Sequence, residues 1–271
     1  MSEEQNEVTT TDENKKVAVA NPNLPAFMQQ DGVAGTENLD QYIRPPMMKI
    51  IQKMSADELV DQFGVGTVIV QPQSQVLAGK EQPLLITPLF QFTEWVVVNP
   101  IQLKDLPSIH DRTIDPKSPI AVKAKNRNTW YEDIPGRINE ETGNPWQRRN
   151  VENINFVCMV HNVEEVKDTP VVFSFSKGRW RDGSDLCMKI RQRKAPIYGC
   201  VFELTSVLRE NASGNFWGQT VANPTQHDAF IQDEEQYKLF KELHEKFDSL
   251  HGEIEVTYDD PKDDDPVIVD M

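Results

Sequence analysis

The chain has 271 residues, of which 38% are hydrophobic, and a formal net charge of −15. Its three cysteines show neither an even count nor the close pairing of a disulfide framework or a CxxC zinc site. The sequence has no signal-peptide pattern and no apolar run of about 18 residues. We therefore expect a cytoplasmic protein rather than a disulfide-rich secreted domain or a membrane protein.

The negative charge is concentrated at the two ends of the chain. Residues 1–40 carry eight acids against two lysines, and residues 252–271 carry eight acids against one lysine. Both ends have few large apolar side chains, so we expect a disordered acidic arm over residues 1–40 and a disordered acidic tail over residues 252–271. Residues 41–251 are nearly neutral, and we expect them to form a single globular domain.

The first part of this domain is predicted to hold one short helix and several strands. A capping-box pattern at residues 55–58 predicts a helix through Leu59 and Val60 that ends at Gly64 and Gly66. Runs rich in Val, Ile, Phe, Trp and Thr predict strands because these residues suit a pleated, half-buried surface. The predicted strands cover residues 67–70, 84–87, 90–98, 120–122, 154–160, 171–176, 198–208 and 214–221.

Two further helices are predicted. The first covers residues 183–194, with Ser184 as its N-cap and with Leu186 and Ile190 facing the core. The second covers residues 227–251 and carries an apolar stripe, which packs on the sheet or, as the alternative, on a partner. The stripe comprises Phe240, Leu243, Phe247 and Leu250. Many short strands with few helices predict a mainly β or α+β fold of the barrel type.

A basic segment follows the predicted strand at residues 171–176. Residues 177–194 hold seven basic side chains against Asp182 and Asp185, in a chain that is otherwise acidic. Trp180 stands between two arginines, and burial of its ring would draw both toward the interior, so we expect it to be exposed in a loop and to stack on bases. Cations also complement the C-terminal end of a helix, but seven exceed what capping needs. The seven are Lys177, Arg179, Arg181, Lys189, Arg191, Arg193 and Lys194.

A second set of basic residues precedes two aromatic residues. Lys123, Lys125 and Arg127 are followed by Trp130 and Tyr131, and this set is predicted to form the other wall of a nucleic-acid groove. The strand residues Phe173 and Phe175 share one face, which is either part of the core or a platform for bases.

No catalytic or metal-binding pattern stands out in the sequence. It contains no Gly-rich phosphate loop, GxGxxG, HExxH or GxSxG motif. The five histidines are scattered, and the run Asp263 to Asp265 has neither the Gly nor the bidentate Glu of a calcium loop. We therefore expect a non-enzymatic protein without a cofactor or a bound metal.

Short phrases and the layout of the chain resemble the single-stranded DNA-binding proteins of tailed bacteriophages. The phrases are IRPPMMKIIQKMS, the KGRW sequence of residues 177–180 and the acidic end YDDPKDDDPVIVDM. The resemblance implies an oligonucleotide/oligosaccharide-binding (OB) barrel and an acidic tail that binds replication partners and shields the DNA groove. Tails of that kind commonly end in an aromatic residue, whereas this chain ends in Met271. The residues implied to bind partners are Asp263, Asp264, Asp265, Val267, Ile268 and Val269.

The sequence thus predicts a protein that coats single-stranded DNA in phage replication or recombination, with little sequence preference. Phosphates would meet the basic residues of both sets, while aromatic residues stack on bases. Homo-oligomerisation is left open. The alternatives are a phage structural or assembly protein whose acidic ends bind a partner, and a regulator that uses its acidic ends to mimic DNA.

Overall fold

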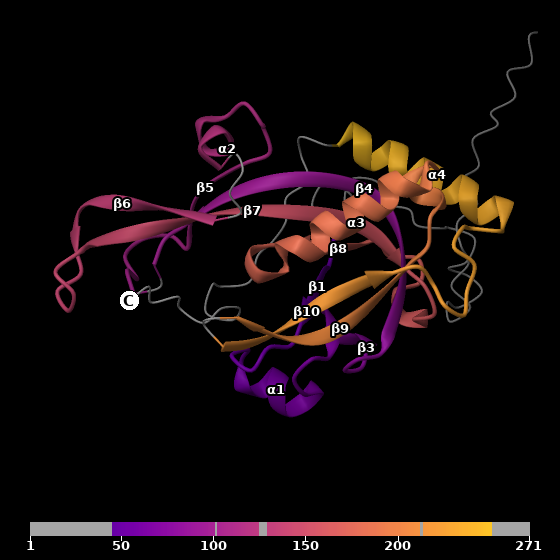
Figure 1. Cartoon of the computed structure of the whole chain (residues 1–271), viewed down its shortest axis with the longest axis horizontal. Coiled ribbons are helices and arrows are strands. Elements are labelled where there is room, and N and C mark those ends of the chain that lie inside the picture. Colours follow the sequence, from indigo (N-terminus) through magenta and orange to yellow (C-terminus); the bar gives the residue numbers. More distant parts are fainter. Residues whose placement is uncertain (1–44, 101, 125–128, 212–213, 251–271) are drawn as a thin grey trace, which may run out of the picture. The chain divides into compact units, whose positions relative to one another are not determined.

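A computed structural model describes residues 45–100, 102–124, 129–211 and 214–250 (Figure 1). The expected acidic arm and acidic tail lie outside the described residues. Within these ranges, no helix is long and apolar enough to cross a membrane.

The described residues form ten strands, four α-helices and three short 3-10 helices. Their bounds are β1 Met47–Ile50, α1 Asp57–Phe63, β2 Val68–Gln71, β3 Gln75–Ala78, β4 Pro83–Val98, β5 Ile109–Thr113, α2 Pro119–Ala124, β6 Thr129–Ile138, β7 Pro145–Val160, η2 Glu164–Val166, β8 Val171–Phe175, η3 Lys177–Arg179, α3 Trp180–Arg193, η4 Ile197–Gly199, β9 Phe202–Asn211, β10 Gly214–Ala222 and α4 Glu234–Ser249.

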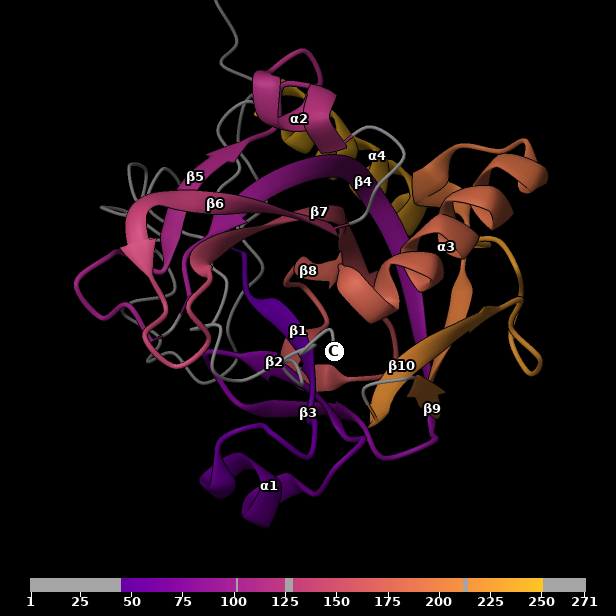
Figure 2. The same cartoon turned by 60° about the vertical axis from the view of Figure 1, so that its left-hand side comes forward.

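All ten strands belong to one mixed sheet with the order β10-β9-β4-β7-β8-β1-β2-β3. In addition, β5 pairs with β4 and β6 pairs with β7. The β1 and β8 strands run parallel, and the other neighbours are antiparallel. Figure 2 shows how strongly β4 curves along its length. The mainly β or α+β class is confirmed, but no pairing among the described residues joins β10 to β3, so the sheet is open rather than a closed barrel.

The helices α3 and α4 cover opposite faces of β7. Alternate side chains of a strand point to opposite faces of its sheet. Phe156 of β7 lies in a buried cluster with Leu186 of α3, whereas Met159 of β7 lies in another cluster with Leu89 of β4 and Phe240 of α4. The apolar stripe of α4 therefore packs on the sheet, as the sequence analysis expected for that helix.

The segment at residues 120–122 was expected to be a strand, and this prediction is wrong because the segment lies in α2. The Ser118 hydroxyl accepts a hydrogen bond from the Ala121 N–H at 3.2 Å, and Pro119 occupies the first helical position. A serine N-cap followed by proline is a helix-start signal, since proline needs no N–H partner there and has the helical φ. This signal outweighs the β-branched pair Ile120 and Val122.

Several other boundaries differ from the prediction. The two strands expected over residues 84–98 are a single strand, β4, in which a register shift between Pro88 and Phe90 accommodates the proline. Ser55 is not the cap of α1; its hydroxyl accepts from the Gln52 N–H at 3.0 Å, and Ala56 stands at the N-cap. The sequence analysis also missed β1, β3, β5 and β6.

Candidate nucleic-acid interface

The basic helix α3 lies very close to the sheet because Gly183 faces β7 and β8. A Cβ atom at Gly183 would lie 2.7 Å from the Cβ of Phe175 and 3.2 Å from that of Ile154. Leu186 is fully buried beside them, and Ile190 packs against the same cluster, as predicted. The expected N-cap at Ser184 is wrong, because the helix begins four residues earlier, at Trp180.

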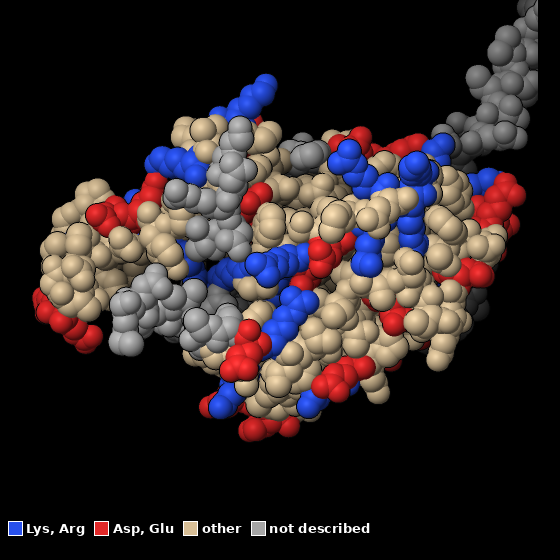
Figure 3. Space-filling model, viewed as in Figure 1, with Lys and Arg blue, Asp and Glu red and all other residues tan. Residues whose placement is uncertain are grey.

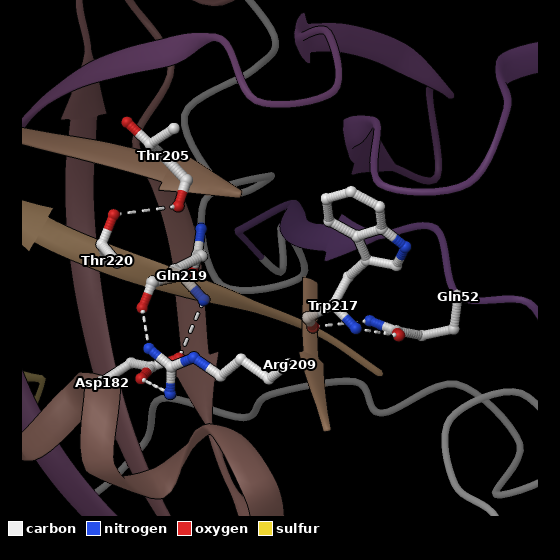
Figure 4. Close-up of polar contacts among 7 residues, drawn as sticks. All are labelled: Gln52, Asp182, Thr205, Arg209, Trp217, Gln219 and Thr220. Atoms are coloured by element: carbon white, nitrogen blue, oxygen red, sulfur yellow. Dashed lines mark hydrogen bonds and ion pairs between the residues drawn. The ribbon is translucent and has the colours of Figure 1, made fainter. Parts of the chain in front are cut away.

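A buried ion pair anchors the first turn of α3 to the edge of the sheet (Figure 4). The side chain of Asp182 is fully buried, and its Oδ1 lies 2.6 Å from Nη1 of Arg209 on β9. The Gln219 N–H on β10 donates to Asp182 Oδ2 at 2.9 Å, and Arg209 Nη2 donates to the Gln219 carbonyl at 2.8 Å. Burial raises the pKa of Asp182, while the Gln219 N–H and Arg209 oppose this shift.

A second side chain covers the same edge of β10. The Trp217 N–H donates to Gln52 Oε1 at 2.8 Å, and Gln52 Nε2 donates to the Trp217 carbonyl at 2.9 Å (Figure 4). The carboxamide of Gln52 thus binds β10 as a peptide group of a neighbouring strand would. The backbone N–H and carbonyl groups of residues 217 and 219 point away from β9, and all of them form hydrogen bonds with side chains. These bonds protect the edge of β10 from pairing with a strand of another chain.

The structure leaves a basic surface on η3 and α3. Of the two acids in the segment, Asp182 is buried and paired with Arg209, so Asp185 is the exposed one. Figure 3, in the same view as Figure 1, shows lysine and arginine side chains gathered along α3. We call this region the α3 surface. It comprises Lys177, Arg179, Arg181, Lys189, Arg191 and Lys194, which are exposed or partly exposed.

Arg193 is engaged within the protein instead. Its guanidinium donates to the Ala229 carbonyl and, at 2.9 Å, to Asn223 Oδ1. The guanidinium carbon lies 4.0 Å from the ring centroid of Phe202 and 5.4 Å from that of Phe230. These contacts join the end of α3 to the segment that precedes α4, so Arg193 acts in the packing of the fold.

Most of the aromatic residues predicted to stack on bases are buried. Phe173 and Phe175 are fully buried core residues, which decides the alternative left open for them. Trp130 is 7% exposed and cannot present its ring to a base. Trp180 was expected in an exposed loop, but it is the first residue of α3 and packs partly buried against the core. Tyr131 is 46% exposed, in line with the prediction.

The second basic set is described only in part. Lys123 lies on α2, with its amino group in an ion pair with Glu132 of β6. Lys125 and Arg127 lie outside the described residues, as do the predicted partner-binding residues of the C-terminal end. The two walls of the expected groove are therefore not brought together by the described residues.

The sequence analysis missed Trp95, which the structure places near the first turn of α3. Trp95 on β4 is directly opposite Glu152 on β7, and both side chains are partly exposed. Burial raises the pKa of Glu152, and the indole of Trp180 opposes this shift. The signal in the sequence is that Gln91, Thr93 and Trp95 are spaced by two and so share one face of the strand, which marks Trp95 as an aromatic residue on a polar face.

Nothing in the described ranges forms a cluster of three or more His, Cys, Asp or Glu side chains that suits a metal ion. A polar hollow is lined by His161, His227 and Glu203 among others, and desolvation followed by the charge of His227 lowers the pKa of His161. Burial raises the pKa of Cys158 and Cys200, which favours the unreactive thiol form.

A family model described as Pam3 phage gp34-like protein matches residues 13–253. No curated protein and no solved structure matched the chain.

Proposed function

The chain belongs to the Pam3 phage gp34-like protein family, and from this premise we propose that it is a non-enzymatic phage protein that coats single-stranded DNA. It would act in replication or recombination, in the cytoplasm of the host. The observation that carries the proposal is the α3 surface, where basic side chains gather on a chain with a net charge of −15.

The α3 surface suits a phosphate backbone for an electrostatic reason. Six basic side chains follow one 3-10 helix and one α-helix. Of the two acids in this segment, Asp182 is buried and paired with Arg209, so Asp185 is the one exposed acid among them. Exposed cations attract phosphates and release the counterions of the nucleic acid on binding. This attraction does not depend on base sequence, which fits a coating protein.

Base stacking would have a smaller part than the sequence analysis expected. Of the predicted platform residues, Tyr131 and Trp180 keep exposed area, whereas Trp130, Phe173 and Phe175 belong to the interior. We retain the OB-like barrel as part of the proposal. It is supported by the curved sheet and by Gln52, which joins β10 to the segment after β1.

The acidic C-terminal tail would recruit replication or recombination proteins and compete with DNA for the α3 surface. Its acids attract basic surfaces over a distance, and its short apolar run supplies an anchor. The residues concerned are Asp263, Asp264, Asp265, Val267, Ile268 and Val269.

A salt series with fluorescent oligo-dT and the intact protein tests the function. The logarithm of the affinity should fall with the logarithm of the salt concentration by about 0.7 for each phosphate contact. Arg191→Glu should weaken binding and reduce this slope. Lys104→Glu, which makes the same charge change at an exposed loop residue outside the α3 surface, should have a much smaller effect.

Folded protein that does not bind oligo-dT at low salt would refute the proposal. Equal losses for Arg191→Glu and Lys104→Glu would show that only the net charge matters, and the α3 surface would not be the interface.

A further inference from the structure

Three side chains meet beside the first turn of α3. Ile154 of β7 faces Gly183 of α3, so Glu152, two residues earlier on the same strand, points to the same face. Trp95 is the direct cross-strand partner of Glu152, and side chains in such pairs have their Cβ atoms about 5 Å apart. The Trp180 indole lies beside Glu152 on the helix side, and within the described residues its buried Nε1 has no hydrogen-bond partner. We call these three residues the Trp95–Glu152–Trp180 cluster.

This cluster is partly exposed to solvent, whereas its neighbours are buried. Trp95, Glu152 and Trp180 are each partly exposed, while Ile154 and Val97 next to them are buried. The basic residues Lys177 and Arg179 immediately precede Trp180. The cluster therefore lies at the end of the α3 surface where a phosphate backbone bound to that surface would present its bases.

Glu152 is unusual in this setting because it is an acid beside a basic surface. Within the described residues, no lysine or arginine forms an ion pair with it, unlike Asp182 with Arg209 or Glu94 with Arg112. Its partial burial disfavours the charged form, and only the Trp180 indole offsets this effect. A partly buried carboxylate without an ion-pair partner among the described residues is suited to accept hydrogen bonds from a ligand.

We propose that the Trp95–Glu152–Trp180 cluster is a nucleobase subsite, in which the two indoles stack on bases and the Glu152 carboxylate accepts a hydrogen bond from an exocyclic amino group. The inference rests on the proposed function and adds a modest base preference to it. Cytosine is bound more tightly than thymine at this subsite.

The preference follows from the edges of the two pyrimidines. Cytosine presents its N4 amino group as a donor, for which a glutamate carboxylate is a suitable acceptor, whereas thymine presents the acceptor O4 at the same position. Stacking on an indole is tolerant of base identity because every base has a π-face. The indoles thus add affinity for both bases, and Glu152 alone discriminates between cytosine and thymine.

The experiment compares oligo-dC with oligo-dT of the same length, bound to the intact protein at neutral pH and at several salt concentrations. The wild-type protein should bind oligo-dC about five to ten times more tightly, the lower range for one good contact to a base edge. Glu152→Gln should bring this ratio close to one, because an amide both donates and accepts. Trp95→Ala should weaken the binding of both oligonucleotides by about fivefold or more.

Asp185→Asn is the matched control, since it also removes one negative charge beside the α3 surface but at an exposed position on α3. It should strengthen the binding of both oligonucleotides equally and leave their ratio unchanged. A ratio near one in the wild type, or a ratio that Glu152→Gln does not change, would overturn the subsite and leave the proposed function standing. Failure to bind either oligonucleotide would overturn both.

Discussion

The helices α3 and α4 are of similar length and both are amphipathic, but their charged side chains are arranged and paired differently. On α4, acids and bases are interspersed and pair with each other, as in Glu234 with Lys238 at 2.7 Å and Lys241 with Glu245 at 3.8 Å. On α3, the bases cluster toward the ends, and Asp182 is turned inward to Arg209. The charged face of α4 is balanced within the helix, whereas that of α3 keeps an excess of basic side chains.

The two helices are also attached to the sheet by different means. Phe240 is the one buried side chain that α4 contributes. By contrast, α3 is attached by Leu186, by the close approach at Gly183 and by the ion pair of Asp182. The helix α4 adds one polar contact with the sheet, between His244 Nδ1 and the Leu89 carbonyl at 2.8 Å. The contact of α3 is an ion pair with a buried carboxylate, which is stronger than a contact between neutral groups and has a defined geometry. This difference fits a helix whose surface side chains must be held in place.

The largest expected effect is on α4. Phe240→Ala removes its buried anchor from the cluster with Leu89 and Met159 and should lower the free energy of unfolding by about 3–5 kcal/mol. The affinity for oligo-dT of the protein that remains folded should not change, because α3 lies on the other face of β7. Urea denaturation and a DNA titration measure the two quantities. A fall in DNA affinity without a loss of stability would contradict the prediction that α4 contributes to stability and α3 to DNA binding.

Removal of the anchor of α3 should have a somewhat smaller effect on stability. Asp182→Ala leaves the Gln219 N–H without its acceptor and Arg209 without its partner, which should cost about 3 kcal/mol. The raised pKa of Asp182 shows that its burial as a charged group is itself unfavourable. The double variant Asp182→Leu with Arg209→Met should therefore be closer to the wild type than Asp182→Ala is.

The matched control is Lys238→Ala on α4, which breaks an exposed ion pair and should cost no more than about 0.5 kcal/mol. If Asp182→Ala and Lys238→Ala cost the same, the buried pair does not anchor α3.

The close approach at Gly183 gives the third prediction. The added methyl group of Gly183→Ala would overlap the Cβ of Phe175, and the helix must move away from β8. Overpacking typically costs 1–3 kcal/mol, and an overlap at 2.7 Å with a Cβ atom places the cost in the upper part of this range, at about 2–3 kcal/mol. The better helix propensity of alanine returns about 1 kcal/mol, so the net loss of stability should be about 1–2 kcal/mol. DNA affinity should also fall, because the α3 surface moves. An unchanged melting temperature would show that the contact is relaxed in solution.

The elements predicted correctly from the sequence are those whose own side chains decide their structure. The strand β8 follows its residue periodicity, and β10 lies where its aromatic residues were recognised. The helix α4 was also recognised, but it begins at Glu234 after the N-cap Asp233, seven residues later than predicted. Failures occurred where a local signal outweighed periodicity, as with Ser118 and Pro119 in α2. The strand β6 was missed because Pro135 and Gly136 interrupt its pattern, and it is held by pairing with β7.

The candidate site was predictable in its charges but not in its aromatic residues. The basic residues of α3 lie close together in the sequence, so composition alone reveals them. The exposure of an aromatic residue depends on contacts between distant segments. Trp180 packs on a core built from strands far away in the chain, and Trp95 meets Glu152 only through the register of β4 with β7. No pattern within one segment contains this information.

The smallest expected effect concerns the pH dependence of Glu152. Burial raises the pKa of Glu152 in the folded protein above its usual value of 4.5, so at neutral pH the charged form opposes folding. Glu152→Gln removes this cost, and the variant should be slightly more stable than the wild type at pH 7. As the pH falls through the folded-state pKa, the wild-type carboxyl takes up a proton in the folded state before it does so in the unfolded state. The advantage of the variant should therefore shrink as the pH is lowered toward 4.5.

Urea denaturation of both proteins between pH 7 and pH 4.5 measures this difference, with Glu235→Gln on the exposed first turn of α4 as the control. A stability difference that stays constant over this range would mean that Glu152 is solvated like the acids of α4.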